Sequence, residues 1–159
     1  MNRILKRAAG GFMAAFMLFS VTGCGKDNSD VKASKPLKDI TQAVMDCGIE
    51  FPEMVDVSED NFQFRYGVSA DDYSEYSVWW AGSGGDADEI CIVKAKDVEK
   101  VKKAVEGRKE SQESVFKDYV EEQYNKLCDS SVKTKGDYVY WVCTNDDKKA
   151  EDTLLSYFE

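Results

Sequence analysis

Hydrophobic side chains along this chain follow two spacings, one typical of helices and one typical of strands. Apolar residues three and four apart predict amphipathic helices, because such residues share one helical face. Two-residue alternation, or a short continuous apolar run, predicts strands. In chain order these patterns predict a helix over 37–47, strands over 76–81 and 89–94, a long helix from 98 to about 120, a short strand within 132–137, a strand over 138–144, and a helix over 147–158.

The order helix, two strands, helix, two strands, helix predicts the fold class. The Gly-rich segment 82–86 and the pair Gly136-Asp137 indicate hairpin turns. Hairpins separated by helices are typical of α+β domains. We therefore predict a small antiparallel sheet of about four strands in two hairpins. The long helix between the hairpins packs on one face of this sheet, and further helices stand at both ends. Between 50 and 68 the pattern predicts only loops and short helical turns.

The first 36 residues have a different pattern from the rest of the chain. Basic residues precede an apolar run over 8–21, which is shorter than the roughly 20 residues that span a membrane and has the layout of a secretory signal. The tetrapeptide ending at Cys24, Val-Thr-Gly-Cys, resembles the bacterial lipobox, whose cysteine is lipid-modified and becomes the mature N-terminus. We predict a signal peptide over 1–23, a lipid-anchored flexible tether over 24–36, and one folded domain over 37–159. An ordinary signal peptide with an incidental cysteine is the alternative.

The predicted lipid anchor and the charge of the chain together predict its location. A diacylglyceryl group at Cys24 would supply the two acyl chains that stable membrane anchoring requires. The chain has 21 basic and 30 acidic residues, and residues 1–23 contain three of the basic ones and no acid, so the part from Cys24 onward carries a formal charge of −12. This charge argues against nucleic acid and against a domain lying flat on anionic lipid. We expect a protein anchored to the outer face of the cytoplasmic membrane in a bacterial cell envelope.

The residue types present exclude several kinds of chemistry. The chain has no histidine, which removes Ser-His-Asp and Cys-His nucleophile activation and the His-based zinc sites. The four cysteines of the predicted domain match no zinc or redox spacing, and we interpret them as buried thiols rather than disulfides. They are Cys47, Cys91, Cys128 and Cys143. We predict no cofactor and no metal.

Two further groups of side chains, neighbouring acids and strand aromatics, have either a functional or a purely structural interpretation. Neighbouring acids, such as Asp86, Asp88 and Glu89 or Asp71 and Asp72, are candidates for glycosidase-like acid–base work, but they arise by chance in so acidic a chain. Aromatic residues gather on the predicted strands, where they either stack on a ligand or fill the core. We favour the core for them. They are Trp79, Trp80, Tyr138, Tyr140 and Trp141.

Arg108 and Gln112 are the anomaly of the long helix, because they lie on its apolar stripe. They share that face with Val101, Val105, Phe116 and Tyr119. A buried guanidinium needs a partner, and Glu89 at the start of the preceding strand is our candidate. Alternatively the face lines a site, where Arg108 presents its fork to an anionic ligand with Gln112 beside it. We favour the structural role.

The motif residues of this region resemble those of a known family. Glu89-Ile90 with Lys94-Ala95-Lys96, then the spaced residues Arg108, Gln112, Phe116 and Tyr119, and later Gly136-x-Tyr138-Val139, are similar to the family called domain of unknown function 4358. Val120 stands where members often carry proline. The resemblance spans about residues 37–158 and implies a small lipoprotein of a Gram-positive bacterium. The family has no assigned activity.

These observations lead to two functional hypotheses. The first is a lipid-anchored envelope protein without enzymatic activity, which binds an envelope protein, a glycan or another ligand. The alternative is a cell-wall or glycan-acting enzyme that uses paired carboxylates. An acid pair facing across a deep cleft would favour the enzyme.

Overall fold

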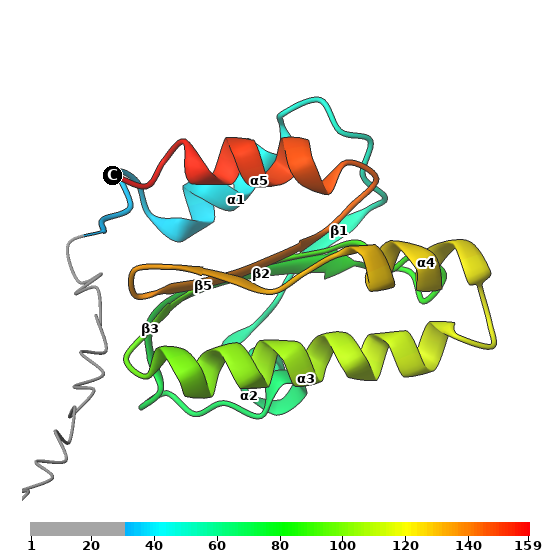
Figure 1. Cartoon of the computed structure of the whole chain (residues 1–159), viewed down its shortest axis with the longest axis horizontal. Coiled ribbons are helices and arrows are strands. Elements are labelled where there is room, and N and C mark those ends of the chain that lie inside the picture. The colour runs from blue at the N-terminus through cyan, green and yellow to red at the C-terminus, as the bar shows by residue number, and fades with distance from the viewer. Residues whose placement is uncertain (1–30) are drawn as a thin grey trace, which may run out of the picture.

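The computed structural model describes residues 31–159. These residues form five helices and one five-stranded sheet (Figure 1). The predicted signal peptide, Cys24 and most of the predicted tether lie outside the described residues. In chain order the elements are α1 Leu37–Met45, β1 Met54–Asp56, α2 Glu59–Tyr66, β2 Tyr73–Ala81, β3 Glu89–Ala95, α3 Val98–Phe116, α4 Glu121–Asp129, β4 Lys133–Lys135, β5 Tyr138–Cys143 and α5 Asp147–Leu155.

The sheet has the order β1-β2-β3-β5-β4, and every neighbouring pair is antiparallel. The two predicted hairpins are present as β2–β3 and β4–β5. The second hairpin turns at Gly136, whose φ of 58° is a left-handed conformation that glycine adopts without strain. β3 is the central strand, and it pairs with β5 from Glu89 opposite Cys143 to Lys94 opposite Tyr138. The two edge strands have three residues each, which leaves few backbone groups free to pair with another chain.

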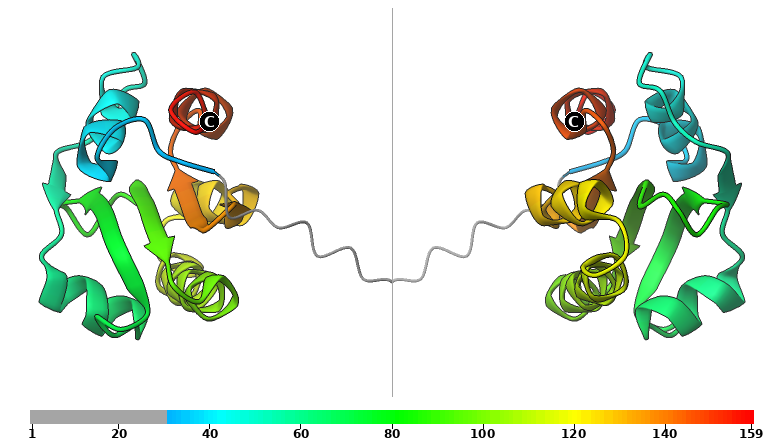
Figure 2. Two further views of the ribbon diagram at one scale, coloured as in Figure 1. Left: turned by 90° about the vertical axis from the view of Figure 1, so that its left-hand side faces the viewer. Right: turned by 90° about the vertical axis from the view of Figure 1, so that its right-hand side faces the viewer.

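Helices cover both faces of the sheet, as the two views of Figure 2 show. Strand alternation divides the core accordingly. On β3, Ile90 and Ile92 point toward α1 and α5, whereas Cys91 and Val93 point toward α2, α3 and α4. β5 alternates in the same way, with Trp141 and Tyr140 on opposite faces. The central strands read as continuous apolar runs because both of their faces are buried.

The predicted fold class is confirmed, and so are its main elements. Both predicted central strands are present, and α3 packs across the sheet through Val101, Val105 and Phe116. Asp97 caps α3, because its carboxylate accepts the Lys100 N–H at 3.0 Å. The aromatic residues of β5 are buried, as we expected, and the two tryptophans of β2 are half-buried.

Several details differ from the prediction. The segment 50–68 contains β1 and a two-turn helix, α2, in addition to loops. The long helix ends at Phe116, and a separate helix, α4, begins at Glu121 after a short turn with Val120 as its N-cap. The two added helices depend on tertiary packing, because each is short and buries side chains that its own sequence pattern does not identify, Phe62 and Tyr66 in α2 and Leu127 in α4.

The segment just before α1 also differs from the predicted tether. Ala33 bridges to Phe158, the Lys32 N–H donates to the Glu159 carbonyl at 3.0 Å, and Glu159 donates back at 3.1 Å. Residues 32–34 therefore belong to the folded domain. Within residues 31–159, every helix is too short or too polar to cross a membrane.

Candidate functional site

The candidate site forms where the start of β3 meets the middle of α3. Glu89 is the first residue of β3, and alternation places its side chain on the same face as Cys91, under α2 and α3. Arg108 follows the buried Val105 by three residues, so the helix carries it on the stripe that packs on the sheet. The side chains of Glu89 and Arg108 therefore meet in the interior between β3 and α3.

Arg108 and Glu89 form a buried ion pair with two parallel hydrogen bonds. Nε of Arg108 donates to Oε1 of Glu89 at 3.1 Å, and Nη2 donates to Oε2 at 2.8 Å. The two side chains are 10% and 1% exposed. The hydroxyl of Tyr66 donates to the same Oε1 at 2.5 Å. The guanidinium carbon also lies 5.2 Å from the ring of Trp80 and 5.9 Å from that of Tyr66, within the range of cation–π attraction.

The protonation states in this cluster follow from its geometry. Burial disfavours the charge on Arg108, but the Glu89 carboxylate outweighs burial and raises the pKa of the guanidinium above its ordinary value. Burial, followed by the nearby Cys91 and Glu89, raises the pKa of Tyr66 well above its ordinary value of 10.0. At neutral pH, Glu89 therefore contacts an Arg108 guanidinium that keeps its charge and a Tyr66 hydroxyl that keeps its proton. This arrangement favours the structural role for Arg108.

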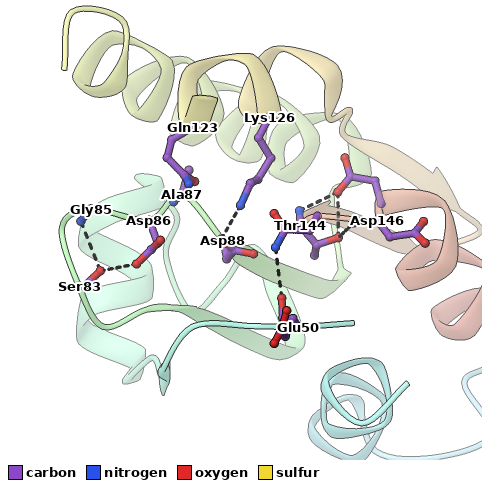
Figure 3. A network of polar contacts seen from close by, with 12 residues as sticks. Glu50, Ser83, Gly85, Asp86, Ala87, Asp88, Gln123, Lys126, Thr144 and Asp146 are labelled. Atoms are coloured by element: carbon purple, nitrogen blue, oxygen red, sulfur yellow. Dashed lines mark hydrogen bonds and ion pairs between the residues drawn. The ribbon is translucent and has the colours of Figure 1, made fainter. Parts of the chain in front are cut away.

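A second buried ion pair adjoins the first. Lys126 of α4 donates to Oδ2 of Asp88 at 2.7 Å, and the side chains are 10% and 1% exposed (Figure 3). The other carboxylate oxygen, Asp88 Oδ1, is buried and has no hydrogen-bond partner among residues 31–159. Burial raises the pKa of Asp88 above its ordinary value of 3.8, although Lys126 opposes this change.

The loop that joins β2 to β3 is held in place by polar contacts. The Ala87 N–H donates to Oε1 of Gln123 at 2.9 Å, which ties the loop to α4. The Ser83 hydroxyl donates to Oδ2 of Asp86 at 2.6 Å and accepts the Gly85 N–H at 3.3 Å. Figure 3 shows Ser83, Gly85 and Asp86 together in the loop and Ala87 beside Gln123. The loop is thus a fixed wall and part of the site rather than only a connection.

A surface pocket of about 200 Å³ is lined by one member of each ion pair, Arg108 and Asp88. Its walls come from the end of α2, the end of β2, the β2–β3 loop and the second half of α3. The polar and aromatic side chains that line it are Arg65, Trp80, Asp86, Asp88, Arg108 and Gln112. Gln112 has no side-chain hydrogen bond among the described residues, and Arg65 has no carboxylate partner there. The pocket therefore combines an aromatic wall with polar groups that the protein itself leaves available.

The structure separates the residues that we predicted as one polar cluster. Glu89 and Arg108 are paired as expected, and Gln112 lies one turn further along α3 in the wall of the pocket. Tyr119 is 72% exposed and lies outside this cluster. Its predicted place on the same helical face is wrong because α3 ends at Phe116, so the helical period does not extend to residue 119. The lipidation residue, Cys24, lies outside the described residues and remains a prediction.

Several residues of the site were missed from the sequence. Tyr66 lies on α2, which the hydrophobic pattern does not identify, and its role as a donor to Glu89 has no local signal. Trp80 was expected on a strand, but its position beside Arg108 depends on the register of β2 against β3. The position of Asp88 directly before a buried strand is a signal that it needs a partner. The sequence does not identify that partner as Lys126, which lies 38 residues further along the chain.

The candidate carboxylates for acid–base chemistry are mostly held by cations. Asp88 binds Lys126, Glu89 binds Arg108, and Asp72 binds Lys100 at 2.6 Å. Among residues 31–159, no three carboxylate or thiol side chains converge in a geometry that could hold a metal ion. The four cysteines of the domain are free thiols, with Cys91 and Cys143 buried, Cys47 half-buried and Cys128 exposed.

The fold and the buried pairs define a small α+β domain whose antiparallel sheet is covered by helices on both faces. The family model "Domain of unknown function (DUF4358)" matches residues 48–144, more than half of the chain, and the chain belongs to this family. Comparison with curated proteins and with solved structures gives no match. The matched segment runs from before β1 to the end of β5 and contains the whole candidate site, whereas α1 and α5 lie outside it.

Proposed function

We propose that this protein is a lipid-anchored component of the bacterial cell envelope that binds a ligand without transforming it. Its anchor is the lipidated Cys24, and its binding site is the pocket between α2, α3 and the β2–β3 loop. The anchor is supported by the lipobox-like tetrapeptide placed directly after a basic and then an apolar segment. The layout leaves the folded domain outside the cytoplasmic membrane, where it meets envelope components.

The observation that carries the binding role is the division of polar groups around the pocket. The buried carboxylates at its base are neutralised by Arg108 and Lys126, so they are poorly placed to exchange protons with a substrate. Gln112 lines the pocket without a side-chain hydrogen bond among the described residues, and the half-buried Trp80 gives the pocket an aromatic wall. Rigid walls with a few available polar groups are typical of binding sites.

An occlusion experiment tests this function. Gly84 lies in the pocket wall, has a backbone conformation open to other residues, and has open space where a Cβ would be added. Gly84→Trp should therefore fill the pocket while preserving the fold. Gly107 has the same open surroundings on α3 but does not line the pocket, so Gly107→Trp is the matched control.

The readout is photo-crosslinking in intact cells from a benzophenone amino acid placed at Val115, an exposed residue of the pocket rim. We expect adducts with an envelope component that persist in Gly107→Trp and disappear in Gly84→Trp. The absence of adducts, or adducts that are insensitive to Gly84→Trp, would contradict the binding role of this pocket. The unsubstituted protein, Gly84→Trp and Gly107→Trp, each with the crosslinker at Val115, should be present in equal amounts in their respective cells.

A further inference from the structure

We infer that the pocket beside Trp80 binds a small zwitterion, of which a free α-amino acid is the simplest example. This inference rests on the proposed function, because it names the chemical class of ligand for the same pocket. In the bound state, the ligand's ammonium group lies toward Asp86 and Asp88, and its carboxylate lies toward Arg65 and Gln112.

The charge balance of the pocket carries the first step. The two ion pairs at its base, Arg108–Glu89 and Lys126–Asp88, are each internally neutral. Two further ionic side chains line the pocket, Arg65 and Asp86, and neither has an oppositely charged partner among the described residues. The pocket thus presents one available cation and one available anion. A ligand with a single charge would satisfy only one of them, whereas a zwitterion satisfies both.

The unpartnered oxygen of Asp88 carries the second step. Asp88 lines the pocket, and its Oδ1 is a buried acceptor without a hydrogen bond among residues 31–159. A buried acceptor in this state gains a bond from any donor that reaches it. An ammonium group carries three donors and a positive charge, so it can serve Asp88 and Asp86 together.

The size and the apolar wall of the pocket carry the third step. Its volume of about 200 Å³ lies below the roughly 300–1,000 Å³ of pockets for drug-sized ligands. Trp80, Val115 and Phe116 supply an apolar side to the same space. A molecule that carries two opposite charges and a short apolar side chain on a single carbon atom matches both properties.

The test is isothermal titration calorimetry on the full-length chain in detergent micelles. The probes are glycine, L-alanine and L-leucine, each with its N-acetyl and its amide derivative, and N,N′-diacetylchitobiose as an uncharged sugar. We expect at least one free amino acid to bind, and both derivatives to bind at least about tenfold more weakly, because each lacks one charge-assisted contact.

Variants of the two available charges locate the binding. Arg65→Gln and Asp86→Asn should each weaken binding by about tenfold or more, and Gly84→Trp should abolish it. The controls are Lys148→Gln and Asp152→Asn, an exposed cation and anion on α5, which should leave the affinity unchanged. Thermal unfolding of each variant checks that the fold is retained.

The inference is overturned if no free amino acid binds up to about 10 mM, which exceeds a weak Kd of about 1 mM. Equal binding of the N-acetyl or amide derivative also overturns it, as does binding that Arg65→Gln and Asp86→Asn leave unchanged. If the crosslinks at Val115 remain sensitive to Gly84→Trp while amino acids fail to bind, the pocket is functional and only the ligand class is wrong. If N,N′-diacetylchitobiose binds and no amino acid does, the ligand is a sugar and the inference of a zwitterion is wrong.

Discussion

Glu89 is the residue on which the interior of the site depends, because it is a fully buried carboxylate at the start of the central strand. Taking such a charge out of water is costly, and it is tolerated only with close and well-directed partners. Two hydrogen bonds from Arg108 and one from Tyr66 meet this requirement. The group is a self-contained unit, in which the loss of one member leaves another without its partner.

Arg108→Ala should therefore destabilise the protein by about 3–5 kcal/mol, because it leaves the Glu89 carboxylate buried and unpaired. Urea-induced unfolding, followed by tryptophan fluorescence, measures this change. Gln112→Ala, one turn away on the same helix and without a side-chain hydrogen bond among the described residues, is the control and should change stability by less than about 0.5 kcal/mol. An unchanged free energy of unfolding in Arg108→Ala would rule out the structural role.

Asp72 gives a pH-dependent prediction. A hydrogen bond from Lys100, together with the Ser69 N–H and hydroxyl, lowers the pKa of this carboxyl from 3.8 to about 2. A carboxyl with a lowered pKa in the folded state contributes stability above its unfolded pKa, and this contribution is lost as the pH falls. The stability difference between wild type and Asp72→Asn should thus be largest above about pH 5 and should shrink as the pH falls through about 2. Unfolding measured at a series of pH values checks this, and a difference that does not depend on pH would contradict it.

At the scale of elements, α3 and α4 cover the same face of the sheet. α3 buries Val101, Val105 and Phe116 against the sheet, and α4 adds Leu127. The turn between them changes the direction of the chain, which lets Gln123 and Lys126 reach the β2–β3 loop. A single longer helix would carry these side chains away from that loop. The site thus depends on where α3 ends.

The N-cap of α3 offers a prediction at this scale. Asp97→Ala removes the carboxylate that accepts the Lys100 N–H, and it should cost about 1 kcal/mol of stability. Asp118→Ala removes another exposed acid, from the turn after α3, and serves as the charge-matched control. Equal unfolding free energies for Asp97→Ala and Asp118→Ala would show that the cap contributes nothing beyond its charge.

At the scale of the whole molecule, the N-terminal segment of the described domain pairs with the C-terminal one. Residues 32–34 run beside 157–159, next to α1 and α5 on the face of the sheet opposite α3 (Figure 1). The pocket, by contrast, is built from elements of the other face. In the proposed anchored protein, the chain therefore enters the domain on one side of the sheet, and the binding pocket belongs to the other.

The proposed anchor gives the prediction at this scale. Cys24→Ala should abolish acylation, and the protein should be released from the membrane or accumulate as an unprocessed precursor. Labelling with a fatty-acid analogue, followed by membrane fractionation, measures both effects. Cys128→Ala removes an exposed thiol of the folded domain instead, and it should be labelled and retained like the wild type. Normal labelling of Cys24→Ala would exclude lipidation at this residue.

Local sequence determined much of this fold, because the buried strands and the packed face of the long helix each require a characteristic spacing of apolar side chains. The apolar runs of β3 and β5, the stripe of α3 from Val101 to Val105, and the turn at Gly136 each identify an element without reference to the rest of the chain. The pair Arg108–Glu89 could also be predicted, since a guanidinium on an apolar stripe requires a nearby carboxylate.

Only the tertiary structure decided the rest, because the deciding contacts join residues far apart in sequence. Tyr66 reaches Glu89 across 23 positions, and Lys126 reaches Asp88 across 38. The end of α3 at Phe116, which excludes Tyr119 from the site, depends on how α4 packs against the sheet. A short helix such as α2 is stabilised mainly by tertiary contacts rather than by its own propensity. The pocket arises only where these separately placed elements meet.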